Sequence, residues 1–257
     1  MIKLSLRFIK PIISLDKTEY KYLSPHVFKD NKVFKLYYCN RKQAYNFSGE
    51  INSAVSLNLK KWEKDNKTII SPNKSKKYRS FISPSFCKIY NKKYLFIEAQ
   101  KKTNSDILCF YLNKRRIWVM KKNLCLINNK HNFQSPFLFK DTKNSILFYS
   151  FNKKEIKYAI ISKKLNYFKK NITFKSSLKN EIFSIYSPSV IKIKDTYCMF
   201  YAAWGSPDKG NINIAISKNL IKWQKKVINI FKFGKNIKII SEPHVIKNNN
   251  KYFIFFE

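Results

Sequence analysis

A short motif recurs five times along this chain at nearly constant spacing. It consists of serine or glutamate, then proline, one variable residue and a hydrophobic residue, and its copies begin at Ser24, Ser83, Ser135, Ser187 and Glu242. The prolines, at positions 25, 84, 136, 188 and 243, are about 52 to 59 residues apart. A repeat of this length is typical of proteins in which each copy forms one supersecondary unit and neighbouring copies share a core.

The residues that follow each motif predict β-strands. A polar turn leads into an aromatic segment at 34–38, 94–97, 146–149, 197–201 and 252–256, which predicts a β-hairpin. A third hydrophobic segment follows at 51–56, 106–112, 156–162 and 212–217. An aromatic residue stands six positions beyond each of these, at Trp62, Trp118, Phe168 and Trp223. We expect a short turn that places this aromatic residue in the same inter-sheet position in each copy.

Four short strands per unit, repeated radially, predict an all-β fold, a five-bladed β-propeller of four-stranded blades. We interpret residues 1–257 as a single propeller domain with blades starting near 24, 83, 135, 187 and 241, the fifth incomplete at Glu257. Residues 2–8 alternate hydrophobic and polar and provide a possible closing strand within 1–23; otherwise the natural chain continues past Glu257. A β-sandwich is the weaker alternative, since that fold requires no constant period.

The charge of the chain does not by itself indicate nucleic-acid binding. Lysine and arginine number 52 against 15 aspartate and glutamate residues, a formal net charge of +37, but only five of the 52 are arginine. Arginine is the residue suited to bidentate recognition of phosphate and guanine. The basic composition, rich also in Asn, Ile, Phe and Tyr, matches an A/T-rich genome. We expect no nucleic-acid partner, and keep lysine-driven binding of a polyanion as an alternative.

Several other classes of protein are disfavoured by the sequence. No apolar run reaches the ~20 residues that span a bilayer, and the N-terminus lacks the pattern of a secretory signal. The five cysteines are scattered without a Cys-x-x-Cys pair, and the four glycines are too far apart for a phosphate-binding loop. We therefore expect a monomeric cytoplasmic protein without a membrane partner and with no cofactor.

Two segments carry a resemblance to a known family. Residues 54–62 read Ala-Val-Ser-Leu-Asn-Leu-Lys-Lys-Trp and residues 215–223 read Ala-Ile-Ser-Lys-Asn-Leu-Ile-Lys-Trp. Together with the Ser-Pro strand starts, they resemble the five-bladed propeller glycosidases: arabinanases, β-xylosidases, invertases and levansucrases of glycoside hydrolase families 43, 32 and 68. The resemblance spans residues 20–257 and implies a glycosidase that acts on a carbohydrate or glycoside substrate.

The strand pattern predicts where a substrate would bind. Residues at the motif start and two positions later share a strand face, so we expect a common pocket at the axis. Its expected substrate-binding lining is Ser24, His26, Ser83, Ser85, Ser135, Ser187, Ser189 and His244, with Phe137 at the remaining position. Loops at 39–50, 98–105, 151–155 and 202–211 would form the rim, where Tyr201 and Trp204 are candidates for sugar contact and Trp204 offers a stacking surface.

The resemblance also suggests catalytic residues, with one departure. The resembled enzymes use an Asp base at the start of the first blade, a second axial Asp and a Glu acid in a later blade. Glu242 matches the acid, whereas Ser24 stands at the position of the base and cannot replace a carboxylate without a separate activator. Glu98 and Asp208 are the remaining candidates for a displaced carboxylate.

Two alternatives therefore remain open. The chain is either a glycoside hydrolase or transferase with Glu242 as its acid, or a catalytically degenerate propeller that binds glycan or serves as a scaffold. A metal ion between His26, His244 and Glu242 is conceivable from position, but two hydrogen-bonding core histidines are the favoured interpretation, so we expect no metal.

Overall fold

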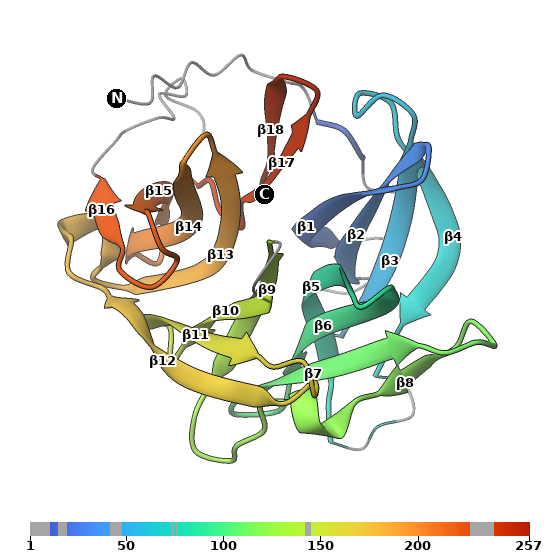
Figure 1. The fold of residues 1–257 in the computed structure, drawn as a ribbon, viewed down its shortest axis with the longest axis horizontal. Helices are drawn as coiled ribbons and strands as arrows, with labels where there is room; N and C mark the ends of the chain where they lie inside the picture. Colours follow the sequence, from blue (N-terminus) through green and yellow to red (C-terminus); the bar gives the residue numbers. More distant parts are fainter. Residues whose placement is uncertain are drawn as a thin grey trace.

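The computed structural model describes residues 11–14, 20–41, 48–72, 75, 77–141, 145–226 and 239–257, with the side chains of residues 66, 168 and 169 excepted. Antiparallel sheets are arranged radially around a central axis, each with its first strand innermost (Figure 1). The predicted all-β propeller is confirmed. The predicted closing strand at residues 2–8 lies outside the described residues.

Four blades have four strands each, in simple up-and-down order. The first blade contains β1 (Lys21–Asp30), β2 (Val33–Arg41), β3 (Gly49–Ser56) and β4 (Glu63–Ile70). The second contains β5 (Ser80–Ile89), β6 (Lys92–Gln100), β7 (Ser105–Leu112) and β8 (Trp118–Met120), followed by the 3₁₀ turn η1 (Lys122–Leu124). The third contains β9 (Phe133–Lys140), β10 (Ser145–Phe151), β11 (Glu155–Ile161) and β12 (Tyr167–Lys175), followed by η2 (Lys179–Glu181). The fourth contains β13 (Ser184–Ile193), β14 (Thr196–Ser206), β15 (Lys209–Ser217) and β16 (Gln224–Lys226).

The last repeat forms a smaller sheet. Strands β17 (His244–Asn248) and β18 (Lys251–Phe255) pair as a two-stranded hairpin among the described residues. Strand β17 contacts both β13 of the fourth blade and β1 of the first, so the hairpin lies between them in the ring (Figure 1). Complete four-stranded blades therefore number four in the described part of the chain, where the repeat count predicts four and a partial fifth.

Each repeat motif interrupts the inner strand in the same way. The residue before each proline has a positive φ: 54° at Ser24, 50° at Ser83, 48° at Ser135, 49° at Ser187 and 54° at Glu242. The pairing of the inner strand with its neighbour shifts at this point in each of the four complete blades. Proline has no backbone N–H to donate to the neighbouring strand. The bulge leaves the proline and the residue before it out of the strand pairing. The sequence pattern does not predict these bulges.

The second recurring motif folds into the turn that ends the third strand. The Ser217 hydroxyl accepts a hydrogen bond from the Leu220 amide (2.9 Å), and the Trp223 indole N–H donates to the Leu220 carbonyl (2.9 Å). The first blade repeats the arrangement with Leu59 and Trp62, whose indole N–H donates to the Leu59 carbonyl at 3.2 Å. Both leucines are buried and have positive φ values of 64–65°. These bonds explain why the aromatic residue stands at a constant offset.

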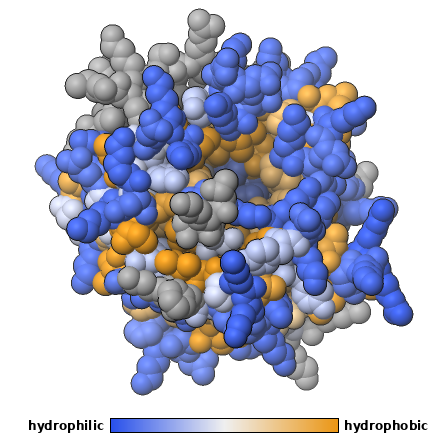
Figure 2. Space-filling model, viewed as in Figure 1, coloured by the Kyte–Doolittle hydropathy of each residue, from blue (hydrophilic) through white to orange (hydrophobic). Residues whose placement is uncertain are grey.

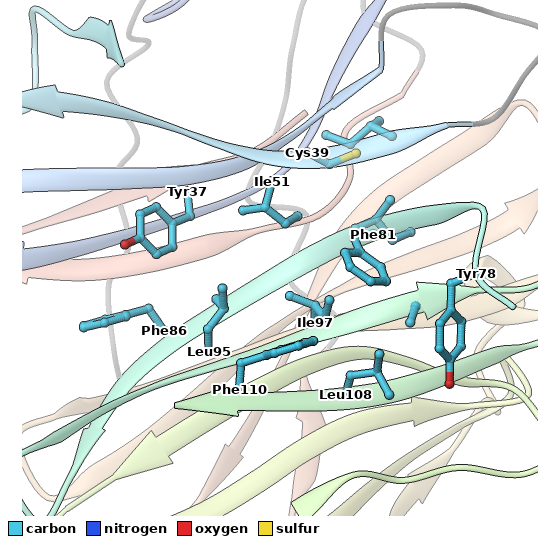
Figure 3. Packing of buried hydrophobic residues seen from close by; sticks show 13 residues of the cluster. Tyr37, Cys39, Ile51, Tyr78, Phe81, Phe86, Leu95, Ile97, Leu108 and Phe110 are labelled. Carbon is cyan, nitrogen blue, oxygen red and sulfur yellow. The ribbon is translucent and has the colours of Figure 1, made fainter. Parts of the chain in front are cut away.

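Buried hydrophobic side chains fill the spaces between successive blades. Between the first and second blades, Tyr37 and Ile51 of the first blade pack against Phe86, Leu95 and neighbouring residues of the second (Figure 3). Comparable clusters occupy the other inter-blade spaces of the described chain. Each blade is thus stabilised by apolar contacts with its neighbours, as expected for a radial repeat protein.

Hydrophilic side chains lie all around the visible face, with hydrophobic side chains between them (Figure 2). Several lysines pair locally; Asp30, for example, has Lys93 at 3.0 Å and Lys88 at 3.3 Å. Among the described residues, no helix has the length and hydropathy required of a membrane-spanning segment.

Candidate functional site

The five motif residues that directly precede a proline, each with a positive φ, form a polar collar around the axis, defined by Ser24, Ser83, Ser135, Ser187 and Glu242. The hydroxyl of Ser24 donates to Glu242 Oε2 (2.8 Å) and lies 3.2 Å from the hydroxyl of Ser83. On the other side, the hydroxyl of Ser187 donates to that of Ser135 (3.3 Å). Non-glycine residues with positive φ are uncommon, and such strain concentrates at functional sites. The collar separates two cavities.

The inner cavity, on the axis, is small. It measures about 30 Å³ and is lined by the five collar residues, the five motif prolines, His26, Phe137 and His244. A water molecule needs roughly 10–15 Å³ of such space, so this cavity holds one or two waters and no sugar. The expected common pocket at the axis exists, but its size excludes it as the place where a glycan binds.

The residues two positions after the collar connect each blade to the next. His26 Nε2 lies 3.1 Å from the Phe86 carbonyl, and His244 Nε2 lies 2.8 Å from the Val27 carbonyl. The hydroxyl of Ser85 accepts from the Leu138 amide at 2.9 Å, and the hydroxyl of Ser189 accepts from the Val245 amide at 3.0 Å. Ser85 and Ser189, expected in the substrate pocket, line neither cavity.

The two axial histidines form a buried pair of neutral rings. The ring centroids of His26 and His244 are 4.2 Å apart, and each lies about 6 Å from the Phe137 ring. Burial lowers the pKa of His244 to about 4; burial and the neighbouring His244 hold the pKa of His26 well below its usual range. No group of three or more metal-ligating side chains occurs among the described residues. The contacts are those of hydrogen-bonding core histidines.

The outer cavity is the candidate active site. It measures about 260 Å³ and is lined by Ile82, Glu98, Gln100, Gln134, Ser135, Lys153, Phe183, Ser184, Tyr186, Trp204 and Glu242. Three of these residues, Ile82, Gln134 and Tyr186, stand immediately before a collar residue. The bulge at the collar places these three preceding residues toward the outer cavity. Four of the predicted site residues meet here: Glu242, Glu98, Trp204 and Ser135.

Glu242 is held at the junction of the two cavities. Its Oε2 accepts hydrogen bonds from the amide (2.5 Å) and the hydroxyl (2.8 Å) of Ser24. Burial, and after it the neighbouring Glu257 carboxyl, raise the pKa of Glu242 to about 8 although the Ser24 bonds oppose this. At neutral pH the carboxyl is therefore mostly protonated, as a general acid requires.

Glu98, at the end of β6, is the second carboxylate of the outer cavity. Its Oε2 accepts from the amide of Ser135 (3.0 Å), and its Oε1 accepts from Gln100 Nε2 (3.1 Å) and the Ser105 hydroxyl (3.1 Å). Only 1% of Glu98 is exposed, and burial raises its pKa in spite of these bonds. Glu98 and Glu242 thus have matching supports, because each carboxylate accepts from the amide of a collar serine.

An aromatic wall faces these carboxylates. The rings of Tyr186 and Trp204 are stacked, with centroids 6.3 Å apart and an interplanar angle of 24°. Two buried polar atoms of the lining, Trp204 Nε1 and Gln134 Oε1, have no hydrogen-bond partner within the described chain. Buried polar atoms are nearly always paired, so this donor and this acceptor are available to water or to a molecule that enters the cavity.

Two other candidates lie elsewhere. Tyr201 is fully buried and its hydroxyl donates to Glu181 Oε1 at 2.6 Å, which is a core contact. Asp208 is exposed in the turn between β14 and β15, where its Oδ1 accepts from the Ser206 hydroxyl at 2.6 Å. Neither residue lines the outer or the inner cavity.

Sequence reasoning did not single out seven residues of the outer cavity, although two of them, Gln100 and Lys153, lie in loops expected at the rim; the seven are Ile82, Gln100, Gln134, Lys153, Phe183, Ser184 and Tyr186. A signal for three of them is present, since Ile82, Gln134 and Tyr186 directly precede a motif serine. This signal is useful only once the bulge is known, because the bulge changes the strand face on which the side chain before the serine lies. Lys153 lies in the 151–155 loop expected at the rim, whereas Phe183, directly before β13, lies outside the repeated motifs.

Known structures share this architecture. No protein-family model matches the sequence, and no curated protein matches it significantly. Among solved structures, a thermostable family-43 glycoside hydrolase is 18% identical, with a TM-score of 0.75 over 91% of this chain and 83% of that one. The α-L-arabinofuranosidase from Lactobacillus brevis is 12% identical, with a TM-score of 0.71 over 91% and 82%. An α-L-arabinofuranosidase from Clostridium thermocellum is 13% identical, with a TM-score of 0.70 over 90% of this chain and 80% of that one. The chain therefore has the fold of the propeller glycosidases.

Proposed function

We propose that this propeller is a carbohydrate-active protein that binds a glycan in the outer cavity and cleaves or transfers a glycosyl group, with Glu242 as general acid. The observation that carries the proposal is that Glu242 and Glu98 line one cavity together with a stacked aromatic pair. Glycosidases normally need two carboxylates beside the scissile bond. The likeness to family-43 enzymes supports the same substrate class.

In this mechanism the proton on Glu242 is transferred to the oxygen of the leaving sugar. Ser24 holds the carboxyl in place and stabilises the carboxylate that remains after proton transfer. Glu98 takes the place of the carboxylate that the first blade lacks, and stabilises positive charge on the sugar ring or acts as base or nucleophile. The faces of Trp204 and Tyr186 hold the sugar, whose hydroxyls pair with Trp204 Nε1 and Gln134 Oε1.

The second candidate is glycan binding without turnover. It is favoured by the hydrogen bonds that occupy both oxygens of Glu98 and fix it in the cavity wall. These bonds stabilise the charged form of Glu98 and occupy the oxygen lone pairs with which it would attack a sugar carbon. Under this alternative the outer cavity binds a glycan without cleaving it, as a lectin does, or the propeller serves as a scaffold.

The test compares Glu242→Gln with the wild-type protein on two kinds of substrate. Oligosaccharides and methyl glycosides of arabinofuranose, xylose and galactose have poor leaving groups, so loss of the acid should reduce turnover roughly 100-fold or more. The matching 4-nitrophenyl glycosides need little protonation and should be affected far less. Glu98→Gln should impair both kinds, and Glu63→Gln, on the exposed outer strand β4, is the control.

The results separate the two candidates. Equal loss on both kinds of substrate, or no loss, contradicts Glu242 as the acid. Binding on a glycan array that depends on Trp204, without turnover of any glycoside, supports the second candidate. Absence of both binding and turnover contradicts the carbohydrate proposal as a whole.

We also propose that β17 and β18 are the inner half of a fifth blade. Two contacts support this interpretation: His244 bonds to the Val27 carbonyl of the first blade, and Val245 bonds to Ser189 of the fourth. The hairpin therefore takes the same place toward its neighbours as the inner strands of the complete blades. Resolving the complete natural protein, with any residues that follow Glu257, would test it.

A further inference from the structure

From the basic side chain in the outer cavity we infer that the glycan bound there carries an anionic group, a sugar carboxylate in the first instance, which pairs with Lys153. This inference rests on the proposed function and specifies its substrate class. Among the described residues that line the outer cavity, Lys153 is the one with a basic side chain.

Lys153 is presented by a turn with a fixed backbone. Asn152 and Lys153, between β10 and β11, have positive φ values of 51° and 57°. The carbonyl of Lys153 accepts a hydrogen bond from the Ile185 amide (2.8 Å), which ties the turn to the start of β13. Consecutive residues with positive φ form the tight hairpin turns that match the twist of the strands. The rim position of Lys153 is therefore set by the scaffold.

The lysines around Lys153 already have partners, whereas its own ammonium group has none in the described chain. Lys154 donates to the Ile182 carbonyl (2.5 Å), and Lys157 and Lys175 pair with Glu155 at 3.2 and 3.3 Å. Lys153 lines the outer cavity, and an ammonium group without a partner in the described chain is available to a ligand there. Lysine acts as a point charge, so it favours an anion without requiring one geometry.

The carboxyl groups in the same cavity do not cancel this preference. Glu242 is mostly protonated at neutral pH, and the oxygens of Glu98, which is buried, point to the donors of Ser135, Ser105 and Gln100, so Glu98 is held in the wall. Lys153 thus contributes an uncompensated positive charge at the rim. The formal net charge of +37 adds a long-range field that draws anionic ligands toward the protein.

The surface beside Lys153 fits a sugar ring. Phe183, which also lines the outer cavity, is 47% exposed, and its amide donates to the Trp204 carbonyl at 2.9 Å. An exposed aromatic face next to a cation suits a ring that has an apolar face and a charged substituent. A hexuronic acid has this combination, and a sulfated sugar has it as well.

The experiment measures binding by isothermal titration calorimetry at 150 mM salt with two matched pairs of ligands. One pair is tri-galacturonic acid and its methyl ester; the other is galactose 6-sulfate and galactose. Lys153→Gln is compared with wild type and with Lys163→Gln, which removes the same charge from an exposed turn of the same blade. We expect the acidic member of at least one pair to bind about tenfold more tightly than its neutral partner, the effect of one charge-assisted contact. This preference should disappear in Lys153→Gln and persist in Lys163→Gln.

Each outcome decides the inference. A preference confined to one pair identifies the anionic group, carboxylate or sulfate. Equal binding of the acidic and neutral members overturns the anionic preference while leaving the glycan-binding proposal in place. A preference lost equally in both variants assigns it to diffuse charge and overturns the role of Lys153. If no ligand of either pair binds, nor any neutral glycan, the proposed function fails with it.

Discussion

The carboxylate of Glu242 accepts two hydrogen bonds from Ser24, one from its amide at 2.5 Å and one from its hydroxyl at 2.8 Å. The two residues are 218 positions apart and occupy equivalent places in the last and first repeats. At the position where the resembled glycosidases have an aspartate, this chain has a serine that donates to the neighbouring Glu242. The Ser24 bonds oppose the rise of the Glu242 pKa, and Glu98 of another blade is the second carboxyl group of the outer cavity.

Removing the hydroxyl of Ser24 should raise the pKa of Glu242 further. A hydrogen bond donated to the charged form stabilises it and lowers the pKa, so Ser24→Ala removes a lowering influence. The pKa can be followed by NMR of carboxyl-labelled glutamate or through the pH profile of glycan turnover. The control is Ser187→Ala, which removes a collar hydroxyl that pairs with Ser135 instead. A pKa that falls, or shifts equally in both variants, contradicts this account.

Much of the architecture follows from the sequence, because the repeat is strictly local. The motif spacing predicts the blade starts, and the alternating hydrophobic segments predict the three inner strands of each complete blade. The constant offset of Trp62 and Trp223 indicates the turn that the structure shows. These features depend on contacts within a few residues, which are visible in one copy and repeated in the next.

The candidate site is predicted less completely, for a physical reason. Alternation along a strand assumes an unbroken ladder, and the proline bulge breaks it at the collar. The outer cavity therefore receives Gln134 and Tyr186, which precede the collar residues, while Ser85 and Ser189 bond to neighbouring blades. The sequence identifies both Glu98 and Glu242 as candidate carboxylates. Whether they line the same cavity depends on how the blades pack across the axis, which the sequence does not show.

The stability of the protein should depend on pH through Glu242. Its pKa is about 8 in the folded state against about 4.5 in the unfolded chain. Between these two values the folded state therefore binds more protons than the unfolded chain. As the pH rises from about 4.5 to 8, Glu242 lowers the free energy of unfolding by up to about 1.4 kcal/mol per pH unit. Glu242→Gln should flatten this decline, which thermal melts at pH 5, 7 and 9 would measure. Glu63→Gln should keep the wild-type slope, and an unchanged slope in Glu242→Gln would contradict a raised pKa.

His244 should contribute a pH dependence of the opposite sign. Its folded-state pKa of about 4 lies below the ordinary value of 6.5, so the unfolded chain binds more protons between these limits and stability rises with pH. His244→Phe should flatten this rise in urea titrations between pH 4 and 7. It should also cost about 1–3 kcal/mol at pH 7, because the Val27 carbonyl loses its donor. Phenylalanine already occupies the equivalent position at Phe137, so the backbone accepts it. An unaltered slope of stability against pH would show that the His244 ring is not held in its neutral form in the folded protein.

Glu181 should be a strong determinant of stability outside the cavity. This carboxylate is fully buried and accepts from the Tyr201 hydroxyl (2.6 Å), Lys225 Nζ (2.6 Å) and the Ser177 amide (2.9 Å). Although burial raises its pKa, the bonds from Lys225 and its other donors lower it below the ordinary value, so their stabilisation is present above pH ~4.5 and lost at lower pH. Glu181→Gln leaves the ammonium group of Lys225 without its charged partner.

We expect Glu181→Gln to reduce the free energy of unfolding by about 3 kcal/mol at pH 7, the usual cost of breaking one side of a buried ion pair. Urea denaturation measures this, with Asp195→Asn at an exposed turn as the control. Lys225→Met combined with Glu181→Gln should cost less than the two single changes added together, since each change alone leaves a partner unsatisfied. A loss no larger than that of Asp195→Asn, or strictly additive losses, would show that the two charges do not stabilise each other.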